Sequence, residues 1–272
     1  MVSTKFEQGT VIAQETLTPS IIRTLIHAPN IAAEALPGQF VNIKCGAPAC
    51  YDPLLLRPFS FNRIDSEDGT FSVLYRVVGR GTELLRHVRI GDKLTALGPL
   101  GKGFVLPEQS KQMEPAARPS VLLIAGGMGI APFYPLATAL VTHGLEVSLL
   151  YGARLSSDLA DNSELKALGL RVLCCTEEQR GECSGLVTDL LQATLGAGNR
   201  FDLAYACGPR AMLSAVKRVC KDAELPLQLS LEEHMACGLG VCLGCSCERA
   251  SDEGYWHICT DGPVVWAEEV KL

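Results

Sequence analysis

The sequence has little of several features that would mark a large class of protein. Its net charge is −6 and its pI is near 5.4, so it lacks the excess of Lys and Arg that binds a phosphate backbone. We therefore expect no nucleic acid as a partner. The five histidines are scattered, and we find neither a Ser–His–Asp set nor a pair of catalytic carboxylates. These absences favour neither a nucleic-acid-binding protein nor an enzyme that works through its own side chains.

Targeting and membrane signals are also scarce. The N-terminal residues MVSTKFEQGT contain no apolar run of the kind that a secretory signal needs. Residues 121–141 carry no charge and are long enough to cross a membrane, but the glycine turn GGMG and two prolines interrupt them. We expect a strand, a turn and a helix there instead. The sequence therefore predicts a cytoplasmic protein with reduced thiols and no membrane span.

The first part of the chain has the pattern of short strands. A length of 272 residues with 47% hydrophobic residues predicts more than one domain. Up to residue 106, apolar residues alternate or cluster in short runs that Pro and Gly separate, which predicts a small antiparallel β-barrel. The expected strands are Thr10–Leu17, Ile21–His27, Gln39–Lys44, Ser60–Arg63, Thr70–Val78 and Lys93–Leu97.

The second part changes rhythm after a proline-rich segment, residues 107–120, that we interpret as a linker or exposed loop. Strands then alternate with helices, which predicts a parallel, doubly wound α/β sheet. The expected strands are Val121–Ala125, Glu146–Tyr151, Leu170–Cys175, Asp202–Cys207 and Leu227–Leu231. The expected helices are Ile130–His143, Ser163–Leu168, Leu186–Leu195 and Arg210–Ala223.

Four cysteines near the C-terminus have the spacing C-x4-C-x2-C-x13-C, which is that of a plant-type [2Fe–2S] ligand set. Thiolates are soft, anionic donors that suit iron. Glycines separate the first three cysteines, and glycine accepts the backbone angles that let N–H groups approach sulfur. The predicted ligands are Cys237, Cys242, Cys245 and Cys259.

Two alternatives apply to this cysteine pattern. A structural zinc site is the nearest, although such sites usually show two separated C-x2-4-C pairs. Disulfides are the other, although twelve cysteines in a chain of this length fall short of the density of a disulfide scaffold. Cys247 is a spare, and His234 is expected at the surface or behind the ligands rather than among them. The other cysteines have no metal spacing: Cys45, Cys50, Cys174, Cys175, Cys183 and Cys220.

Two motifs in the α/β part suit a nucleotide. AGGMGIAP, residues 125–132, lies between a strand and a helix, where glycines and a helix N-terminus accept phosphate. ACGPRAML, residues 206–213, follows a later strand and opens another helix, so Cys207 could face a nicotinamide ring. A plain tight turn for the first motif, and a buried cysteine for the second, are the alternatives.

Two weaker motifs lie in the β-rich part. LRPFSF, residues 56–61, offers the guanidinium of Arg57 to a phosphate, with a hydroxyl from Ser60. YRVVGRGTELL, residues 75–85, places glycines and Thr82 before a short helix, which is an anion-binding shape. Each motif alone is weak evidence.

The four motifs in this order, with the cysteine loop at the end, are far more specific together. Over essentially all 272 residues the sequence resembles the ferredoxin–NADP reductase superfamily and, within it, the electron-transfer subunits of dihydroorotate dehydrogenase B. The tail CTDGPVV, residues 259–265, fits the same pattern. Many relatives carry a second Arg before the Arg-Pro pair, whereas Leu56 stands there in this chain.

The resemblance implies three units and their sites. They are an FAD-binding barrel over residues 1–106, an NAD-binding α/β domain over 118–226 and a [2Fe–2S] domain over 227–272, with the four cysteines as cluster ligands. FAD would contact Arg57, Pro58, Phe59, Ser60, Leu74, Tyr75, Arg76, Gly81 and Thr82. NAD would contact Gly126, Gly127, Gly129, Gly208 and Pro209, with Cys207 as the catalytic residue.

The resemblance also implies an activity. The chain would be an oxidoreductase subunit of pyrimidine biosynthesis, in a heterotetramer with two copies of an FMN-containing catalytic subunit that oxidises dihydroorotate. Electrons would pass from that FMN through the cluster to FAD, and then as hydride to NAD+. The alternatives are a related FAD and [2Fe–2S] subunit that serves ferredoxin or a hydrogenase, and a zinc-stabilised interaction protein. Ferredoxin-dependent relatives often have Asp at the first ligand position, so Cys237 favours the dihydroorotate branch.

The choice between NAD and NADP stays open on the residues. After the second α/β strand the chain reads YGARLSSD. Arg154, Ser156 and Ser157 would suit a 2′-phosphate, while Asp158 would suit a ribose hydroxyl. The family resemblance favours NAD.

Overall fold

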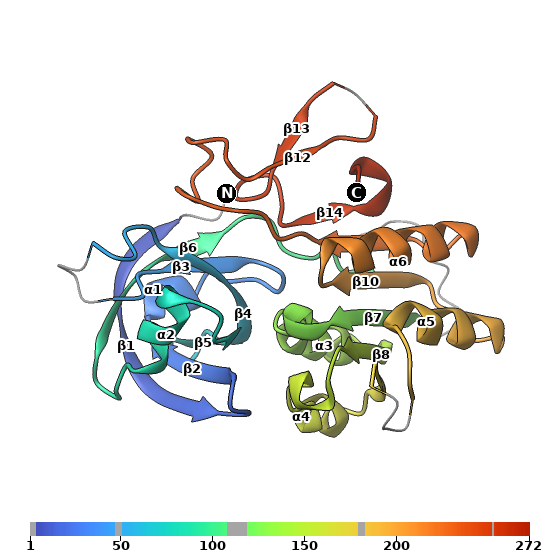
Figure 1. Ribbon diagram of the computed structural model, residues 1–272, viewed down its shortest axis with the longest axis horizontal. Helices are drawn as coiled ribbons and strands as arrows, with labels where there is room; N and C mark the ends of the chain where they lie inside the picture. The colour runs from blue at the N-terminus through green and yellow to red at the C-terminus, as the bar shows by residue number, and fades with distance from the viewer. Residues whose placement is uncertain (1–3, 47–50, 108–118, 179–182, 252) are drawn as a thin grey trace.

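The computed structural model describes residues 4–46, 51–107, 119–178, 183–251 and 253–272. It has three units (Figure 1): a barrel, an α/β domain beside it, and a smaller C-terminal unit that lies across the top of both. Cys50 and most of the expected linker, residues 107–120, lie outside the described residues.

The barrel is a closed antiparallel sheet in the strand order β1-β2-β5-β4-β3-β6, which confirms the predicted small barrel. Side chains alternate along β3, so that Val41 and Ile43 pack inside the barrel while Phe40 packs outside it, against the other two units. Two short helices, α1 (Pro29–Ala32) and α2 (Arg80–Arg86), lie in its connections. The strands are β1 (Lys5–Thr16), β2 (Ile21–His27), β3 (Phe40–Ile43), β4 (Arg57–Asp65), β5 (Thr70–Arg76) and β6 (Lys93–Leu100).

The α/β domain is a six-stranded sheet in the order β14-β11-β10-β7-β8-β9, in which β14 is Val264–Trp266. Its strands pair in parallel except for β14, which pairs antiparallel with β11 at the edge. The parallel strands are β7 (Ser120–Gly126), β8 (Glu146–Ala153), β9 (Arg171–Thr176), β10 (Leu203–Cys207) and β11 (Leu227–Ser230).

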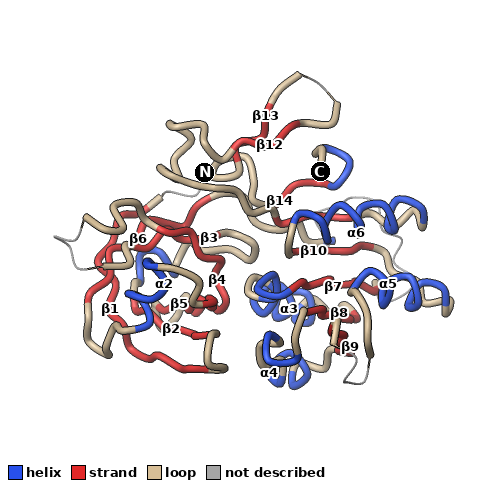
Figure 2. Tube along the Cα trace, in the orientation of Figure 1, coloured by secondary structure: helices blue, strands red, loops and turns tan. Residues whose placement is uncertain are grey.

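Helices cover both faces of this sheet, as a doubly wound domain requires (Figure 2). On one face lie α5 (Val187–Gly196) and α6 (Arg210–Asp222), and on the other lie α3 (Phe133–Thr142) and α4 (Ser163–Ala167). Short 3-10 turns, η2 (Gly127–Ile130) and η3 (Ser156–Asp158), follow β7 and β8. The predicted helix at 130–143 therefore begins later, because the chain first makes the tight turn η2.

The uncharged stretch of residues 121–141 divides as expected into β7, the turn η2 and α3. Its apolar character reflects burial, since Val121, Leu123 and Leu136 are completely covered. Within the described part of the chain, no helix has the length and apolar character that a membrane crossing requires.

The C-terminal unit is joined to the edge of the α/β sheet at β11 and again at β14. The chain leaves the sheet after β11, forms a small hairpin of β12 (Ser246–Glu248) and β13 (Tyr255–His257), and returns as β14 (Val264–Trp266), followed by the turn η4 (Ala267–Glu269). Strand β11, which the predicted boundary at residue 227 assigns to the C-terminal unit, pairs with β10. The C-terminal unit and the α/β domain thus share one sheet.

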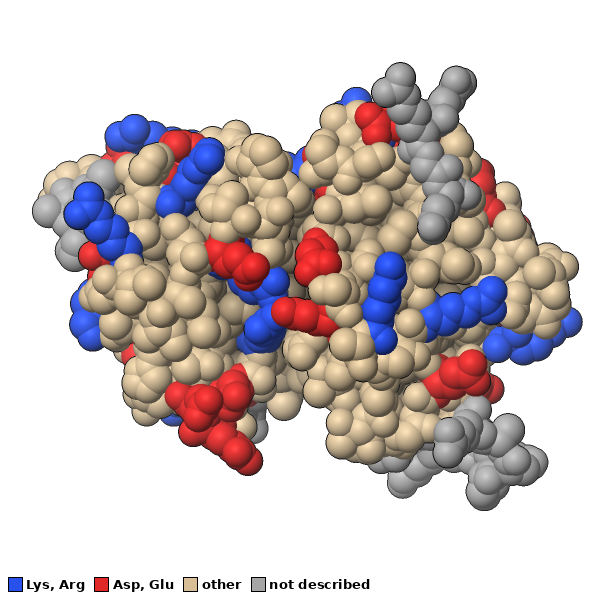
Figure 3. All heavy atoms as spheres, turned by 90° about the horizontal axis from the view of Figure 1, so that it is seen from below, with Lys and Arg blue, Asp and Glu red and all other residues tan. Residues whose placement is uncertain are grey.

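Ion pairs join the barrel to the α/β domain. Arg23 on β2 contacts Glu164 on α4 at 3.0 Å, and Arg63 on β4 contacts the same carboxylate. Arg76 on β5 contacts Asp158 on η3 at 3.1 Å. Seen from below, acidic and basic side chains meet along the junction of the two lobes (Figure 3). These pairs fix the barrel and the α/β domain on opposite sides of one cleft.

Candidate functional site

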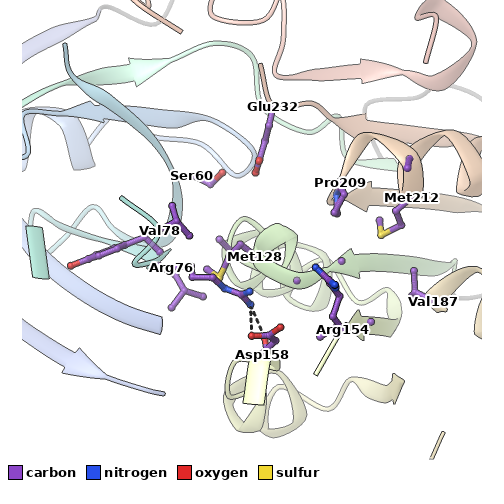
Figure 4. A pocket seen from close by; sticks show the side chains of 18 of the residues that line it. Ser60, Arg76, Val78, Met128, Arg154, Asp158, Val187, Pro209, Met212 and Glu232 are labelled. Carbon is purple, nitrogen blue, oxygen red and sulfur yellow. Dashed lines mark hydrogen bonds and ion pairs between the residues drawn. The ribbon is translucent and has the colours of Figure 1, made fainter. Parts of the chain in front are cut away.

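A cavity of about 770 Å³ lies between the barrel and the α/β domain (Figure 4). Both units contribute to its wall, as is usual for cofactor sites at domain junctions. From the barrel it is lined by Pro58, Phe59, Ser60, Leu74, Tyr75, Arg76, Val78 and Thr82. From the α/β domain and the segment after β11 it is lined by residues that include Gly126, Gly127, Met128, Ala131, Arg154, Asp158, Glu177, Val187, Thr188, Pro209, Met212 and Glu232.

The barrel side of the cavity is built from strand β4 and the turn before α2. Because Phe59 packs into the barrel interior, its neighbours Pro58 and Ser60 face outward. The Thr82 hydroxyl accepts hydrogen bonds from the backbone N–H groups of Val78 and Gly79, at 3.0 and 3.2 Å. Thr82 therefore fixes the turn that precedes α2, but it lies in the first turn of that helix and not before it as the motif predicts.

The α/β side is built where the two nucleotide motifs meet. A Cβ at Gly129 would overlap the carbonyl of Cys207, and a Cβ at Gly126 would overlap the sulfur of Met212. The GGMG turn and the CGP turn therefore pack backbone against backbone, which only glycine permits. Parallel strands β7 and β10 are neighbours in the sheet, so both turns lie at the same carboxyl edge, where ligands of open α/β sheets bind.

Most of the predicted cofactor residues line this cavity. Those that do are Pro58, Phe59, Ser60, Leu74, Tyr75, Arg76, Thr82, Gly126, Gly127 and Pro209. The lining does not include Arg57, Gly81, Gly129, Cys207 or Gly208. The cofactor roles of the residues in both groups stay predictions.

Cys207 is 1% exposed, and its thiol is hydrogen-bonded to Ser230. Burial raises the pKa of this thiol well above its ordinary value, and the nearby Glu232 carboxylate raises it further. The side chain is therefore a neutral thiol at physiological pH. It packs in the apolar core and does not suit attack as a thiolate.

Glu232 is a cavity residue that the sequence motifs do not single out. It follows β11, and its side chain reaches down into the cavity on the side of Ser60 (Figure 4). Glu232 is exposed to solvent through the open cavity, but desolvation by the surrounding wall raises the pKa of its carboxyl group above the ordinary value. The signal that could have found it is position, since polar residues just beyond a buried parallel strand lie at the ligand edge of the sheet.

The far end of the cavity holds the residues that bear on the choice of nucleotide. Arg154 and Asp158 line it as predicted, and Asp158 is paired with Arg76. The backbone N–H and the hydroxyl of Ser156 both donate to the Glu178 carboxylate, each at 2.8 Å. Two donors that a 2′-phosphate could use are therefore already engaged by an internal carboxylate.

The four predicted cluster cysteines lie together as two contact pairs in the C-terminal unit. Cys237 is hydrogen-bonded to Cys242, and Cys245 to Cys259. Among the described residues, no three Cys, His, Asp or Glu side chains surround a single metal-sized point. Two pairs of thiols match two irons that take two thiolates each, and fit a single tetrahedral zinc less well.

Backbone N–H groups point at the sulfurs of this loop. Leu239 and Cys242 donate to the sulfur of Cys237, at 3.3 and 3.4 Å, and lower the pKa of that thiol to about 6. Gly240 donates to the sulfur of Cys259 at 3.1 Å. Gly240 has a φ of +76°, in the left-handed region that glycine occupies without strain. The loop is thus shaped to hold anionic sulfur.

Burial divides the four cysteines. Cys245 and Cys259 are each 2% exposed, and burial raises the pKa of Cys259 to about 12. Cys242 is exposed, and Cys237 is partly so. One pair therefore faces the protein interior and the other lies toward the surface.

Two family models match the chain. Residues 232–271 match the iron–sulfur cluster binding domain of dihydroorotate dehydrogenase B, and this segment contains all four cysteines. Residues 123–218 match an oxidoreductase NAD-binding domain, from β7 into α6. The first match covers the cysteine loop, and the second covers the α/β side of the cavity.

Curated relatives align along nearly the whole chain. The electron transfer subunit of dihydroorotate dehydrogenase B (NAD(+)) from Geobacillus thermodenitrificans is 37% identical over 267 residues, which cover 98% of each chain. The subunit of the same name from Listeria monocytogenes serotype 4a is 37% identical over 262 residues, 96% of this chain and 97% of its own. The chain belongs to this family of electron-transfer subunits. The family resemblance that the motifs indicate is therefore confirmed.

Solved structures place this family in a wider fold group. A chain of the NADH-dependent reduced ferredoxin–NADP oxidoreductase, studied for flavin-based electron bifurcation, superimposes with a TM-score of 0.82 at 28% identity and covers 100% of this chain. The superposition covers 91% of the oxidoreductase chain. The ferredoxin NADP+ reductase of Neisseria gonorrhoeae, with bound FAD and NADP, superimposes with a TM-score of 0.65 at 20% identity over 80% of this chain and 91% of that chain. The second likeness shows the fold alone.

Proposed function

We propose that this chain is the electron-transfer subunit of an NAD-dependent dihydroorotate dehydrogenase of pyrimidine biosynthesis. It would work in the cytoplasm with an FMN-containing catalytic subunit, as a heterotetramer with two copies of each. The observation that supports this most is the placement of two candidate sites on neighbouring strands of the barrel. The cavity lies against β4, and the cysteine loop packs over β3 and β6.

The residues at these sites fit the three cofactors of the family. FAD would be held on the barrel side by Pro58, Ser60, Arg76 and Thr82, and NAD by the glycines of the GGMG turn. The two cysteine pairs would hold the [2Fe–2S] cluster. A flavin exchanges both hydride and single electrons, a two-iron cluster exchanges single electrons, and nicotinamide exchanges hydride, so this set joins one-electron to two-electron chemistry.

The protein's own part is to bind, orient and shield. The GGMG turn would offer backbone N–H groups to phosphate from Gly127, and the apolar side chains of Met128, Met212 and Val187 would exclude water from the cavity. Glu232 keeps its proton to a higher pH than an ordinary carboxyl group does. Its carboxyl group can therefore hold or release a proton at the cavity wall near Ser60.

The surface around the outer cysteine pair suits the catalytic partner. Val241 is 80% exposed, and Leu239 and Leu243 are about half exposed, on either side of the exposed Cys242. A large apolar side chain on each side of an exposed ligand marks an interaction site rather than ordinary surface. We place the contact with the FMN-containing subunit there.

Co-purification tests the proposal. The chain, tagged and isolated from its native host, should carry FAD and iron in a brown protein, together with a second subunit that contains FMN. The complex should reduce NAD+ with dihydroorotate. A colourless protein with stoichiometric zinc would overturn the redox assignment, and a coloured protein without dihydroorotate oxidation would overturn the partner.

A second candidate function rests on the close superposition with the ferredoxin–NADP oxidoreductase chain. In that case the same cofactors would serve ferredoxin, or a hydrogenase, in place of dihydroorotate. The isolated complex should then exchange electrons between reduced ferredoxin or hydrogen and NAD(P)+. Failure of these reactions alongside turnover of dihydroorotate would exclude this candidate.

A further inference from the structure

Asn42 is a buried polar residue that lies between the two candidate sites. It sits on β3, and its registered neighbours are Pro58 on β4 and Leu97 on β6. Directly paired residues of antiparallel strands share one face, so Asn42 lies on the outer face of the barrel beside Pro58. Pro58 lines the cofactor cavity. Strand β3, which carries Asn42, therefore lies between Pro58 in the cavity wall and Leu97 on β6.

On that other side lies the cysteine loop. A Cβ at Gly238 would overlap the amide nitrogen Nδ2 of Asn42, so this amide packs directly against the backbone that follows Cys237. The same Nδ2 donates to the sulfur of Met235 at 3.9 Å. Gly238 has a φ of +73° and is also close to Leu100 on β6. The loop that begins at the first predicted ligand thus rests on the Asn42 amide.

The chemistry of Asn42 is unusual for its surroundings. Its side chain is 1% exposed, and its Oδ1 has no hydrogen-bond partner among the described residues. Its neighbours on the same face include Phe40, Leu97 and Leu100, which pack in an apolar core. An apolar residue of similar size would avoid the loss of stability that an unsatisfied buried carbonyl causes. A reason other than packing is therefore needed for the amide.

We propose that Asn42 is a positioning residue that seats the cysteine loop against the flavin face of the barrel and raises the reduction potential of the cluster. Its N–H groups present the positive end of an amide dipole to the loop. Reduction adds a negative charge to an iron–sulfur cluster, and nearby N–H donors in a dry environment favour the reduced form. The inference rests on the proposed function, since it requires the cluster to be held by Cys237 and its partners.

The test replaces Asn42 with Leu, which keeps the size and removes the amide, and separately with Ala, which keeps only the Cβ. The midpoint potential of the cluster is measured in the FAD-loaded protein by a redox titration followed by electron paramagnetic resonance. We expect both variants to titrate at a more negative potential than the wild type. The equilibrium between reduced cluster and reduced flavin should change by roughly three- to tenfold, the effect of losing one hydrogen bond of ordinary strength.

Asn62→Leu is the matched control. Asn62 is also a buried asparagine of the barrel, but its amide donates to the carbonyl of Ala131 at 3.0 Å and its Oδ1 accepts from Ser72. These contacts are with the α/β domain and with strand β5, and neither is with the cysteine loop, so the loss of Asn62 should leave the cluster potential unchanged. Reduction of FAD by NADH should remain in the Asn42 variants.

The outcomes separate the inference from the function on which it rests. A wild-type protein without a cluster would overturn the proposed function. A wild-type cluster whose potential is unchanged in the Asn42 variants would overturn the role of Asn42 and leave the function standing. Loss of the cluster from both variants with FAD retained would show that Asn42 only supports the fold. It would overturn the proposal that Asn42 raises the reduction potential of the cluster.

Discussion

At the scale of single residues, the predicted cluster ligands differ from the spare cysteine, Cys247. Cys242 is exposed and hydrogen-bonded to Cys237, whereas Cys247, five residues later, is 2% exposed and receives a 3.8 Å contact from the guanidinium of Arg210. Arg210 also pairs with Glu233 at 2.8 Å. Cys247 is therefore a structural residue at the base of the unit, which spacing alone leaves open.

Replacing Cys242 with Ser should abolish the cluster, because serine is a poor ligand for iron and each iron needs both thiolates of its pair. Reduction of FAD by NADH should survive, since the cavity is built from other elements. The measurement is the visible spectrum with iron content. Cys247→Ser is the control and should keep the cluster; full cluster absorbance in Cys242→Ser would mean that the ligand set is wrong.

Glu178 is expected to act against NADP by engaging both donors of Ser156. Replacing Glu178 with Ala frees these donors and removes a negative charge that repels a 2′-phosphate. We expect the ratio of kcat/KM for NADPH to that for NADH to rise about tenfold. Steady-state FAD reduction by each coenzyme measures it, with Glu146→Ala at the opposite end of β8 as a control that leaves the ratio unchanged. If the ratio were unchanged in the folded Glu178 variant, Glu178 would not contribute to the preference for NADH over NADPH.

At the scale of elements, the backbone contact between the GGMG turn and the CGP turn is the most restrictive packing in the cavity wall. Gly129→Ala should destabilise the protein by about 1–3 kcal/mol, because its methyl group would overlap the carbonyl of Cys207 and force the two turns apart. Affinity for NAD should fall with it. Thermal unfolding and NAD titration measure the two effects.

The control for this prediction is Gly196→Ala at the end of α5, where an added Cβ meets nothing within 4 Å. It should leave stability within about 0.5 kcal/mol or raise it slightly, because alanine favours the helix. Equal losses from both variants would mean that the two turns can move apart freely.

Elements with a local pattern could be predicted from the sequence. The barrel strands alternate, and the nucleotide turns and the cysteine loop have glycine and cysteine spacings that reflect their own backbone. By contrast, β12, β13 and β14 have three residues each, which is too short for an alternation of apolar and polar residues to be recognised. Glu232 and Asn42 belong to the site through contacts between distant segments, which no short window of sequence contains.

At the scale of the whole molecule, the junction of barrel and α/β domain depends on Glu164. Its carboxylate contacts Arg23 and Arg63, and the Arg23 side chain is only 11% exposed. Glu164→Gln should lower the free energy of unfolding by about 1–3 kcal/mol, because a largely buried guanidinium loses its main charged partner. Denaturant unfolding measures the loss.

Glu248→Gln is the comparison for this pair. Glu248 contacts Lys271 at 3.7 Å, with both side chains 59% exposed, so its loss should change stability by at most about 0.5 kcal/mol. If the two variants lost the same amount, the ion pairs at the junction would not hold the two units together.

The cysteine-bearing unit enters and leaves the molecule at one place. Ser230 at the end of β11 and Val264 at the start of β14 are registered partners in adjacent antiparallel strands. Such a pair is what a two-residue hairpin turn closes. Residues 231–263, which carry all four cysteines, are thus a single insertion between two neighbouring positions of the sheet, and the tail after β14 packs back on them through hydrogen bonds such as that from the Ala250 N–H to the Glu269 carbonyl. The sheet therefore holds the two ends of the cysteine-bearing segment side by side.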